Sequence, residues 1–239
     1  MNKICISFDV DWAKDAMIEP LIRTLQEHKI KATFFATHHS ELLANIDNSQ
    51  FEIGIHPNFN NSTNDFEKPI TDLLKIYPNA KGVRSHSLFE SGKILFLFQK
   101  YGLKYVSNLH LPYHENLHPV VRYGSLEKNP LVGIPFYFAD DFHYMFRKTF
   151  HLNNLNLDKS GLKNFAFHPI HTFMNTHSED FYNSYKNDYQ NPEILKHKTN
   201  KGNGVATLFN LLINHITANN INTFTLSEIS NEYILNSKL

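Results

Sequence analysis

Short apolar runs recur along the chain and are separated by segments with helical spacing. The first run, residues 3–8, places Ile4, Ile6 and Phe8 at every second position, which is typical of a strand. Similar runs predict strands at residues 32–36, 51–55, 81–85, 104–107, 131–138, 164–167 and 222–226. Apolar residues at helical spacing predict helices at residues 14–28, 40–46, 66–76, 92–101 and 205–218, and a short helix follows the last strand.

Strands that alternate with helices favour a parallel β/α architecture. Seven or so such units lead us to expect an α/β fold, a distorted (β/α) barrel of about seven parallel strands, rather than an open sheet. Residues 109–128 and 180–201 interrupt the pattern and are interpreted as long excursions, which in compact domains are more often functional than idle. Because no linker, repeat or low-complexity tract divides the chain, we expect one domain over residues 1–239.

Composition narrows the classes of function. Lys+Arg and Asp+Glu both number 23 in the 239 residues, so the chain lacks the basic surface of a nucleic-acid-binding protein. No apolar run approaches the roughly 20 residues that cross a bilayer, and the N-terminal residues are interpreted as a strand, not as a signal peptide. We therefore expect a cytoplasmic protein without nucleic-acid partners or membrane segments; its oligomeric state stays open.

Cysteine and histidine content bears on metal chemistry. The single cysteine, Cys5, excludes an internal disulfide and a cysteine zinc cluster. The 15 histidines are more informative, because histidine is the commonest metal ligand and the usual acid or base near neutral pH. Any metal site in this chain would therefore use oxygen and nitrogen ligands.

Polar residues gather where the predicted strands end. In chain order these residues are Asp9, Asp11, His56, Arg84, His86, Asp140, Asp141, His143, His168 and His171. The carboxyl ends of the strands of a β/α barrel converge on one face, where active sites are found. Carboxylate and imidazole groups that meet there would form a metal site or an acid–base constellation.

Each cluster also has a simpler explanation when it is taken alone. Asp9 and Asp11 would stabilise the first turn of the following helix. His56 precedes Pro57 and would simply end its strand, and Arg84 would form a surface ion pair of little energetic value. The joint pattern, rather than any single residue, favours a functional site.

Several segments resemble the polysaccharide deacetylases of carbohydrate esterase family 4, also called nodulation-type deacetylase homologues. Residues 7–12, Ser-Phe-Asp-Val-Asp-Trp, look like the first motif of that family, and residues 31–35, Lys-Ala-Thr-Phe-Phe, resemble its second strand. Residues 51–56 lead into a sequence similar to the second motif. Residues 55–60, 83–87, 140–143 and 167–176 resemble a divergent branch associated with O-antigen and other surface polysaccharides.

The resemblance implies a metal-dependent amide hydrolase that removes an N-acetyl or N-formyl group from an amino sugar. It implies a divalent metal, usually zinc, held by Asp11, His56 and the residue at position 60, which is Asn60 here. It further implies that Asp9 is the general base and His168 the general acid.

Two further roles follow from the same resemblance. Arg84 would orient the catalytic carboxylate, and Asp141 or Asp140 would hold Arg84. Without an export signal, the expected substrate is a small-molecule or lipid-linked amino sugar made for a surface polysaccharide.

The second and third motifs depart from the family pattern. The second motif normally provides His-x-x-x-His, whereas position 60 carries Asn60, a neutral ligand that binds zinc more weakly than imidazole does. The third ligand could therefore be Asn60, His86, His171 or Asp141. The same departure supports an alternative function, a catalytically inactive carbohydrate-binding protein on the same fold. The third motif has Ser85, His86 and Ser87 where the family has Pro-Tyr.

Overall fold

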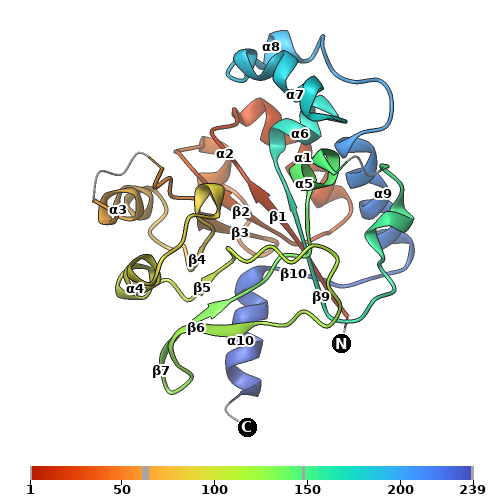
Figure 1. Cartoon of the computed structure of the whole chain (residues 1–239). Coiled ribbons are helices and arrows are strands. Elements are labelled where there is room, and N and C mark those ends of the chain that lie inside the picture. Colours follow the sequence, from red (N-terminus) through yellow and green to blue (C-terminus); the bar gives the residue numbers. More distant parts are fainter. Residues whose placement is uncertain (1, 61–64, 147–148, 238–239) are drawn as a thin grey trace.

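A mostly parallel sheet forms the centre of the molecule. The computed structural model describes residues 2–60, 65–146 and 149–237 (Figure 1). Within these residues nine strands follow the order β6-β7-β5-β4-β3-β2-β1-β9-β8, and a tenth, β10, pairs with the beginning of β1. The strands are β1 (Lys3–Asp9), β2 (Ala32–Ala36), β3 (Phe51–Ile55), β4 (Gly82–Val83), β5 (Tyr105–Val106), β6 (Val120–Ser125), β7 (Lys128–Gly133), β8 (Phe138–Ala139), β9 (Leu162–Phe167) and β10 (Thr223–Phe224).

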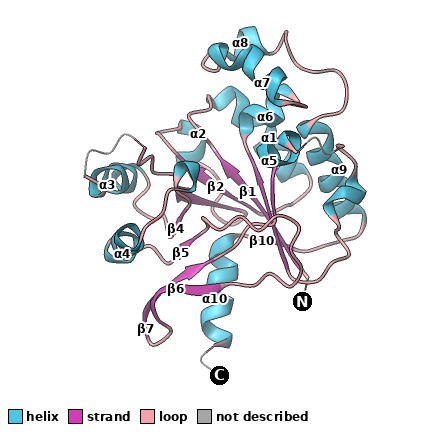
Figure 2. Cartoon of the chain, in the orientation of Figure 1, coloured by secondary structure: helices cyan, strands magenta, loops and turns pink. Residues whose placement is uncertain are grey.

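Helices surround this sheet (Figure 2). They are α1 (Asp15–Glu27), α2 (Glu41–Ala44), α3 (Glu67–Ile76), α4 (Gly92–Lys100), α5 (Asp140–Met145), α6 (Pro169–Met174), α7 (Glu179–Tyr185), α8 (Pro192–Leu195), α9 (Val205–Ala218) and α10 (Leu226–Asn236). Three short 3-10 helices are η1 (His86–Leu88), η2 (Leu152–Leu155) and η3 (Lys186–Asp188). Among the described helices, none has both the length and the apolar character needed to cross a membrane.

The most buried strands lie in the middle of the sheet. All side chains of β2 and β9 are buried, as are all those of β1 beyond Lys3. Phe8 of β1 stacks on Phe34 of β2 with ring centroids 4.8 Å apart, and Phe209 of α9 contacts Phe8 from the helical layer. Strands buried on both faces have continuous apolar sequences, which explains why the sequence pattern identifies these strands well.

The architecture confirms the expected α/β fold, because the parallel strands curl into a half-barrel. Two details of the prediction were wrong. The expected strand at residues 131–138 is two strands, β7 and β8, which Pro135 separates since it has no N–H to donate. The excursions at 109–128 and 180–201 are also more ordered than expected: the first contains β6, and the second contains most of α7 and all of α8.

Strand register brings the polar strand ends together. Phe8 of β1 pairs with Phe167 of β9, so the residues that follow them, Asp9 and His168, leave the sheet side by side. Ile55 of β3 pairs with Val83 of β4, which likewise places the following residues, His56 and Arg84, next to each other. The parallel sheet therefore delivers side chains from four strands to one edge.

Candidate active site

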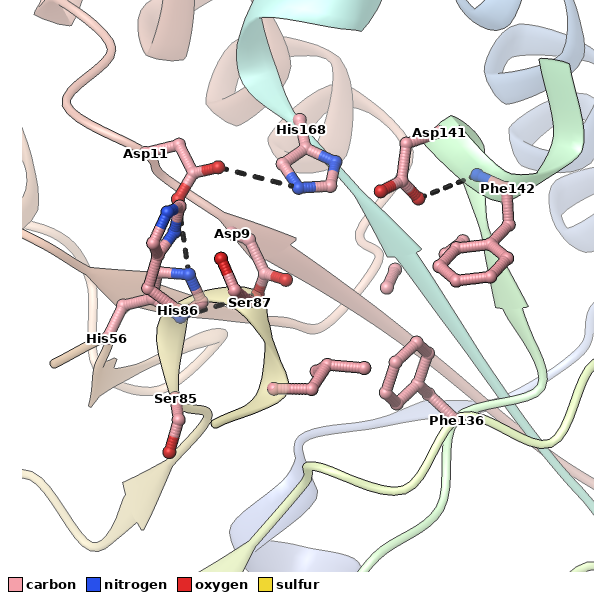
Figure 3. A pocket seen from close by; sticks show the side chains of 13 residues that line it. Asp9, Asp11, His56, Ser85, His86, Ser87, Phe136, Asp141, Phe142 and His168 are labelled. Atoms are coloured by element: carbon pink, nitrogen blue, oxygen red, sulfur yellow. Dashed lines mark hydrogen bonds and ion pairs between the residues drawn. The ribbon is translucent and has the colours of Figure 1, made fainter. Parts of the chain in front are cut away.

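A cavity of about 250 Å³ opens at the carboxyl ends of the strands (Figure 3). Both polar and apolar side chains line it. The polar lining includes Asp9, Asp11, His56, His86, Asp141 and His168. The apolar lining consists of Leu88, Phe136, Ala139, Phe142 and Ala166. A cavity of this kind accommodates a small group with one polar, reactive end.

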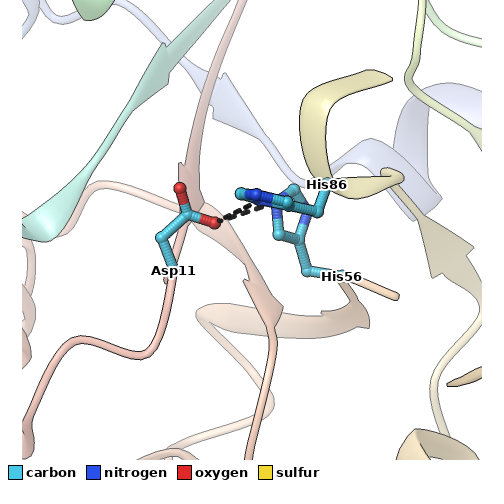
Figure 4. Close-up of side chains that lie close together, drawn as sticks. All are labelled: Asp11, His56 and His86. Carbon is cyan, nitrogen blue, oxygen red and sulfur yellow. Dashed lines mark hydrogen bonds and ion pairs between the residues drawn. The ribbon is translucent and has the colours of Figure 1, made fainter. Parts of the chain in front are cut away.

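Three potential metal ligands converge in this cavity: Asp11, His56 and His86 (Figure 4). Oδ1 of Asp11 lies 3.1 Å from Nε2 of His56 and 3.0 Å from Nδ1 of His86. Two ligands of a tetrahedral zinc ion are about 3.4 Å apart, since each bond is about 2.0–2.1 Å long. The three donor atoms and the distances between them therefore fit a divalent metal ion, provided that these atoms move slightly apart.

The electrostatics of the three residues agree with this fit. Burial alone would raise the pKa of Asp11, but its hydrogen bonds with His56 and His86 outweigh burial and hold that pKa well below its usual range. The hydrogen bond with Asp11 raises the pKa of His86. The carboxylate is thus ionised at neutral pH, as a metal ligand must be.

Backbone strain accompanies two of the three ligands. Asp11 and Trp12 have φ values of 45° and 59°, and Ser87 and Leu88, which follow His86, have φ values of 54° and 55°. Such left-handed conformations cost about 1–3 kcal/mol each for residues other than glycine, and they cluster at functional sites. The strained turns direct Asp11 and His86 toward the same point.

Asp9 is held by Arg84, a fully buried cation. Nη1 of Arg84 donates to Oδ1 of Asp9 at 2.8 Å, while its other nitrogens donate to Ser7 and Ser107. The guanidinium also lies between two aromatic rings, 4.6 Å from the centroid of each. Oδ2 of Asp9 accepts no hydrogen bond from the described residues, so one carboxylate oxygen faces the cavity without a partner.

His168 is paired with Asp140 at the opposite side of the site. Nδ1 of His168 lies 2.7 Å from Oδ1 of Asp140, and its backbone N–H donates to Oδ2 at 2.7 Å. Nε2 of His168 lies 3.7 Å from Oδ2 of Asp11, so this nitrogen points to the metal-ligand cluster. Burial lowers the pKa of His168, but Asp140 more than compensates and raises it well above the usual value.

Asp141 occupies a different position from the one expected. The prediction was that Asp141 or Asp140 would hold Arg84, but the hydrogen bonds of Arg84 go to Ser7, Asp9 and Ser107. Asp141 lines the cavity, and burial raises its pKa. Asp140 instead orients His168. The hydroxyls of Ser7 and Ser107 bind Arg84 where the carboxylate of Asp141 or Asp140 was expected.

Asn60 does not line the cavity that holds the ligand cluster. It is exposed, and its side-chain amide donates to Oγ of Ser87 at 3.2 Å. His86, which sequence reasoning named only as an alternative, completes the cluster instead. In the sequence, His86 was noticeable because it stands two residues after Arg84, at the end of a predicted strand. Only the structure of η1 shows that its ring points into the cavity.

A second group of potential ligands, Asp140, His168 and His171, is engaged in hydrogen bonds. Nε2 and Nδ1 of His171 lie 3.3 Å from the hydroxyls of Tyr144 and Thr176, respectively. Burial lowers the pKa of His171 to about 4, so its ring is neutral at physiological pH. His171 is therefore a neutral, hydrogen-bonded neighbour of His168, the candidate general acid. Asp11, His56 and His86 form the better metal site.

The sequence matches a known protein family. A family model described as WbmS-like polysaccharide deacetylase matches residues 6–186, about three quarters of the chain. The chain belongs to this family. The resemblance to polysaccharide deacetylases in the sequence motifs is thereby confirmed. No curated protein matches the sequence.

Solved structures agree with membership of the WbmS-like family. A Bordetella bronchiseptica protein named as a putative polysaccharide deacetylase involved in O-antigen biosynthesis is 30% identical, with a TM-score of 0.81 over 89% of this chain and 90% of that one. A family 4 acetyl xylan esterase from Clostridium thermocellum, solved with a cobalt ion, is 15% identical and has a TM-score of 0.53 over 96% and 90%. A family 4 pseudoenzyme from Bacillus anthracis is 10% identical, with a TM-score of 0.53 over 95% and 65%. The latter two share the fold.

Proposed function

We propose that the protein is a metal-dependent amide hydrolase that removes an N-acetyl or N-formyl group from an amino sugar precursor of a surface polysaccharide. The convergence of Asp11, His56 and His86 on one point beside Asp9 and His168 carries this proposal. Family membership supports the reaction type, and the similarity to the Bordetella protein supports the link to O-antigen precursors.

In this proposal Asp11, His56 and His86 hold a divalent metal, with zinc as the expected ion. His86 would supply the second imidazole, which the family takes from a histidine of its second motif. When bound, the metal would polarise the acyl carbonyl and lower the pKa of the attacking water. The imidazole of His86 is a stronger zinc ligand than the amide of Asn60, so the departure at position 60 does not remove the site.

In this proposal Asp9 and His168 transfer protons. The free Oδ2 of Asp9 accepts a proton from water as water attacks the acyl carbon, and Arg84 keeps this carboxylate in place. His168, protonated because Asp140 raises its pKa, gives a proton to the sugar nitrogen as the C–N bond breaks. The products are the free amine and the carboxylic acid, acetate or formate.

Metal content tests the ligand assignment. Protein purified without chelators should carry close to one divalent ion per chain. Asp11→Ala, His56→Ala and His86→Ala should each lose most of this metal, whereas the control Asn60→Ala should retain it. Retention of full metal by His86→Ala together with loss in Asn60→Ala would contradict the assignment.

Turnover tests the reaction. We expect release of acetate or formate, with one free amine per acyl group, from acylated amino-sugar nucleotides incubated with the metal-loaded protein. Asp9→Asn should keep its metal and lose at least about 10²-fold in kcat, because general base catalysis contributes roughly that much. An Asp9→Asn protein with wild-type turnover would remove Asp9 from the mechanism.

A carbohydrate-binding protein without turnover is the second candidate, and Asn60 in place of a motif histidine favours it. The same measurements separate the two functions. A site that binds no metal under any loading condition, in a protein that still binds acylated amino sugars, would support the binding protein and contradict the hydrolase.

A further inference from the structure

Asp141 is the carboxylate of the cavity lining to which the proposed mechanism gives no role. Its Oδ1 accepts the backbone N–H of Phe142 at 2.7 Å. Its Oδ2 has no hydrogen bond with the described residues, and it is not one of their fully buried unpaired atoms. One carboxylate oxygen of Asp141 is therefore accessible and free to accept a hydrogen bond from a ligand in the cavity.

Phe142, the next residue, offers an accessible aromatic surface in the same cavity. It is 36% exposed and belongs to the cavity lining. The ring of His110 stands nearly perpendicular to that of Phe142, with centroids 4.5 Å apart, and it stacks on Phe136 at the same distance. These aromatic neighbours hold the ring of Phe142 in place, and its accessible part is left for a ligand.

The proposed reaction places the sugar ring near Asp141 and Phe142. His168 gives its proton to the nitrogen that stays on the sugar, so the sugar ring lies next to His168. Asp140, which orients His168, directly precedes Asp141 in the chain, and Figure 3 shows His168 between Asp11 and Asp141. With the acyl group beside the metal ligands, the sugar ring therefore extends toward Asp141.

We propose that Asp141 and Phe142 form a subsite for the pyranose ring of the substrate. The free carboxylate oxygen of Asp141 accepts a hydrogen bond from a sugar hydroxyl near the acylamino group, and the ring of Phe142 packs against C–H groups of the sugar. This inference rests on the proposed function, since it assumes that an acylated amino sugar enters the cavity. It adds separate roles for three consecutive residues: Asp140 positions the general acid, and Asp141 and Phe142 bind the sugar.

Two acetamides separate the hydrogen bond from the packing of the ring. N-acetylglucosamine carries hydroxyls on its ring, whereas N-cyclohexylacetamide has a ring of the same size without hydroxyls. Saturation-transfer NMR of the metal-loaded protein measures the Kd of each compound and also records acetate release. Because burial raises the pKa of Asp141, the pH is kept slightly alkaline so that its carboxylate is ionised. Absence of saturable binding by either compound would contradict the subsite.

Asp141→Asn tests the hydrogen bond. It keeps an oxygen for the N–H of Phe142, so the melting temperature should stay close to that of wild type, but it replaces the free oxygen with an NH₂ donor. We expect the Kd of N-acetylglucosamine to rise about tenfold and that of N-cyclohexylacetamide to stay within about twofold. An unchanged sugar Kd, or an equal rise for both compounds, would overturn the role of Asp141.

Phe142→Leu tests the packing, because it removes the aromatic ring and keeps an apolar side chain. We expect the Kd of both compounds to rise about fivefold. Phe146→Leu is the matched control: its ring is 67% exposed and lies 6.0 Å from that of Phe142, but it is not part of the cavity lining. Both Kd values in this control should stay within about twofold of wild type. No effect of Phe142→Leu, or equal effects of the two variants, would overturn the role of Phe142.

The measurements distinguish this inference from the proposed function. Acetate release by the wild type, together with Kd values that Asp141→Asn and Phe142→Leu leave unchanged, would leave the hydrolase standing and remove the subsite. Sugar binding that weakens in both variants, in a protein that turns over no acylated amino sugar, would support the subsite and contradict the hydrolase.

Discussion

At the scale of single residues, the three carboxylates of the site differ in the side chains that they contact. Oδ1 of Asp11 faces two imidazoles, whereas the side chain hydrogen-bonded to Asp9 is Arg84 and the side chain hydrogen-bonded to Asp140 is His168. In the proposed mechanism each carboxylate thereby has a single role, which is metal binding for Asp11, proton acceptance for Asp9 and orientation of His168 for Asp140. Because the three pairs are buried or partly buried, loss of one partner should alter the chemistry of the other.

Replacement of Asp140 by Asn should shift the pH dependence of turnover. Asp140 raises the pKa of His168, so wild-type His168 stays protonated, and active as an acid, up to a pH well above its usual pKa of about 6.5. In Asp140→Asn this pKa falls, and the alkaline limb of the kcat profile should move to lower pH by at least about one unit. The profile is measured from about pH 5 to about pH 10.

The control for this prediction is Asp141→Asn. It leaves the contact between Asp140 and His168 intact, so its alkaline limb should shift less than that of Asp140→Asn. An unchanged limb in Asp140→Asn would mean that His168 does not supply the proton.

Sequence reasoning reached most of these residues and the pairing of Arg84 with Asp9, but it missed the pairing of His168 with Asp140. Asp9, Asp11, His56 and His168 were predictable because each follows a well-formed strand, and the parallel sheet gathers strand ends. The position of His86 depends on the left-handed backbone at Ser87 and Leu88, for which the sequence has no glycine as a signal. Their roles stay predictions until the metal and turnover are measured.

At the scale of elements, two very short strands carry part of the site. β4 has only two residues, and Arg84 follows directly after them. The ring of Tyr105 in β5 covers Gly82 of β4, and the hydroxyl of Tyr105 bonds Glu52 of β3 at 2.8 Å. The absence of a side chain at position 82 therefore allows β4 and β5 to pack closely beside Arg84.

Gly82→Ala should destabilise the protein and disturb the site. A Cβ atom at position 82 would lie 1.9 Å from Cζ of Tyr105, a ring that is fully buried and cannot move aside easily. We expect a loss of about 1–3 kcal/mol or more in the free energy of unfolding, measured by urea titration. Gly92→Ala is the control, because a Cβ there meets no atom within 4 Å, and it should leave stability unchanged or slightly higher. Equal stabilities of the two variants would contradict this packing.

The elements that the sequence did not predict were missed for two different physical reasons. The pairing of β6 with β7 contains register shifts between Val121 and Tyr123 and between Tyr123 and Ser125, which interrupt the alternation of inward and outward residues. α7 and α8 are short and lie outside the central sheet, so their apolar residues are few. Continuous buried runs such as β1, β2 and β9 were predictable because both faces of these strands are covered.

At the scale of the whole molecule, β1 connects distant parts of the chain. It pairs with β2, β9 and β10, which come from the beginning, the middle and the end of the chain. Ile4 and Cys5 at its start pair with β10, and Asp9 at its end reaches the cavity. Exposure of β1 therefore requires the C-terminal part of the chain to separate from the N-terminal part.

The single cysteine offers a test of this global role. Cys5 is fully buried in β1, and burial raises the pKa of its thiol above the ordinary value. Because the thiolate is the reactive form, a thiol-specific reagent such as 5,5′-dithiobis(2-nitrobenzoic acid) should label native Cys5 at least about 10³-fold more slowly than the denatured chain. Labelling is followed by absorbance in buffer and in denaturant. If opening of β1 needs global unfolding, Gly82→Ala should accelerate labelling by the same factor by which it increases the equilibrium constant for unfolding, and Gly92→Ala should not. Fast labelling of the native wild type would show that β1 opens locally, contrary to its place at the centre of the sheet.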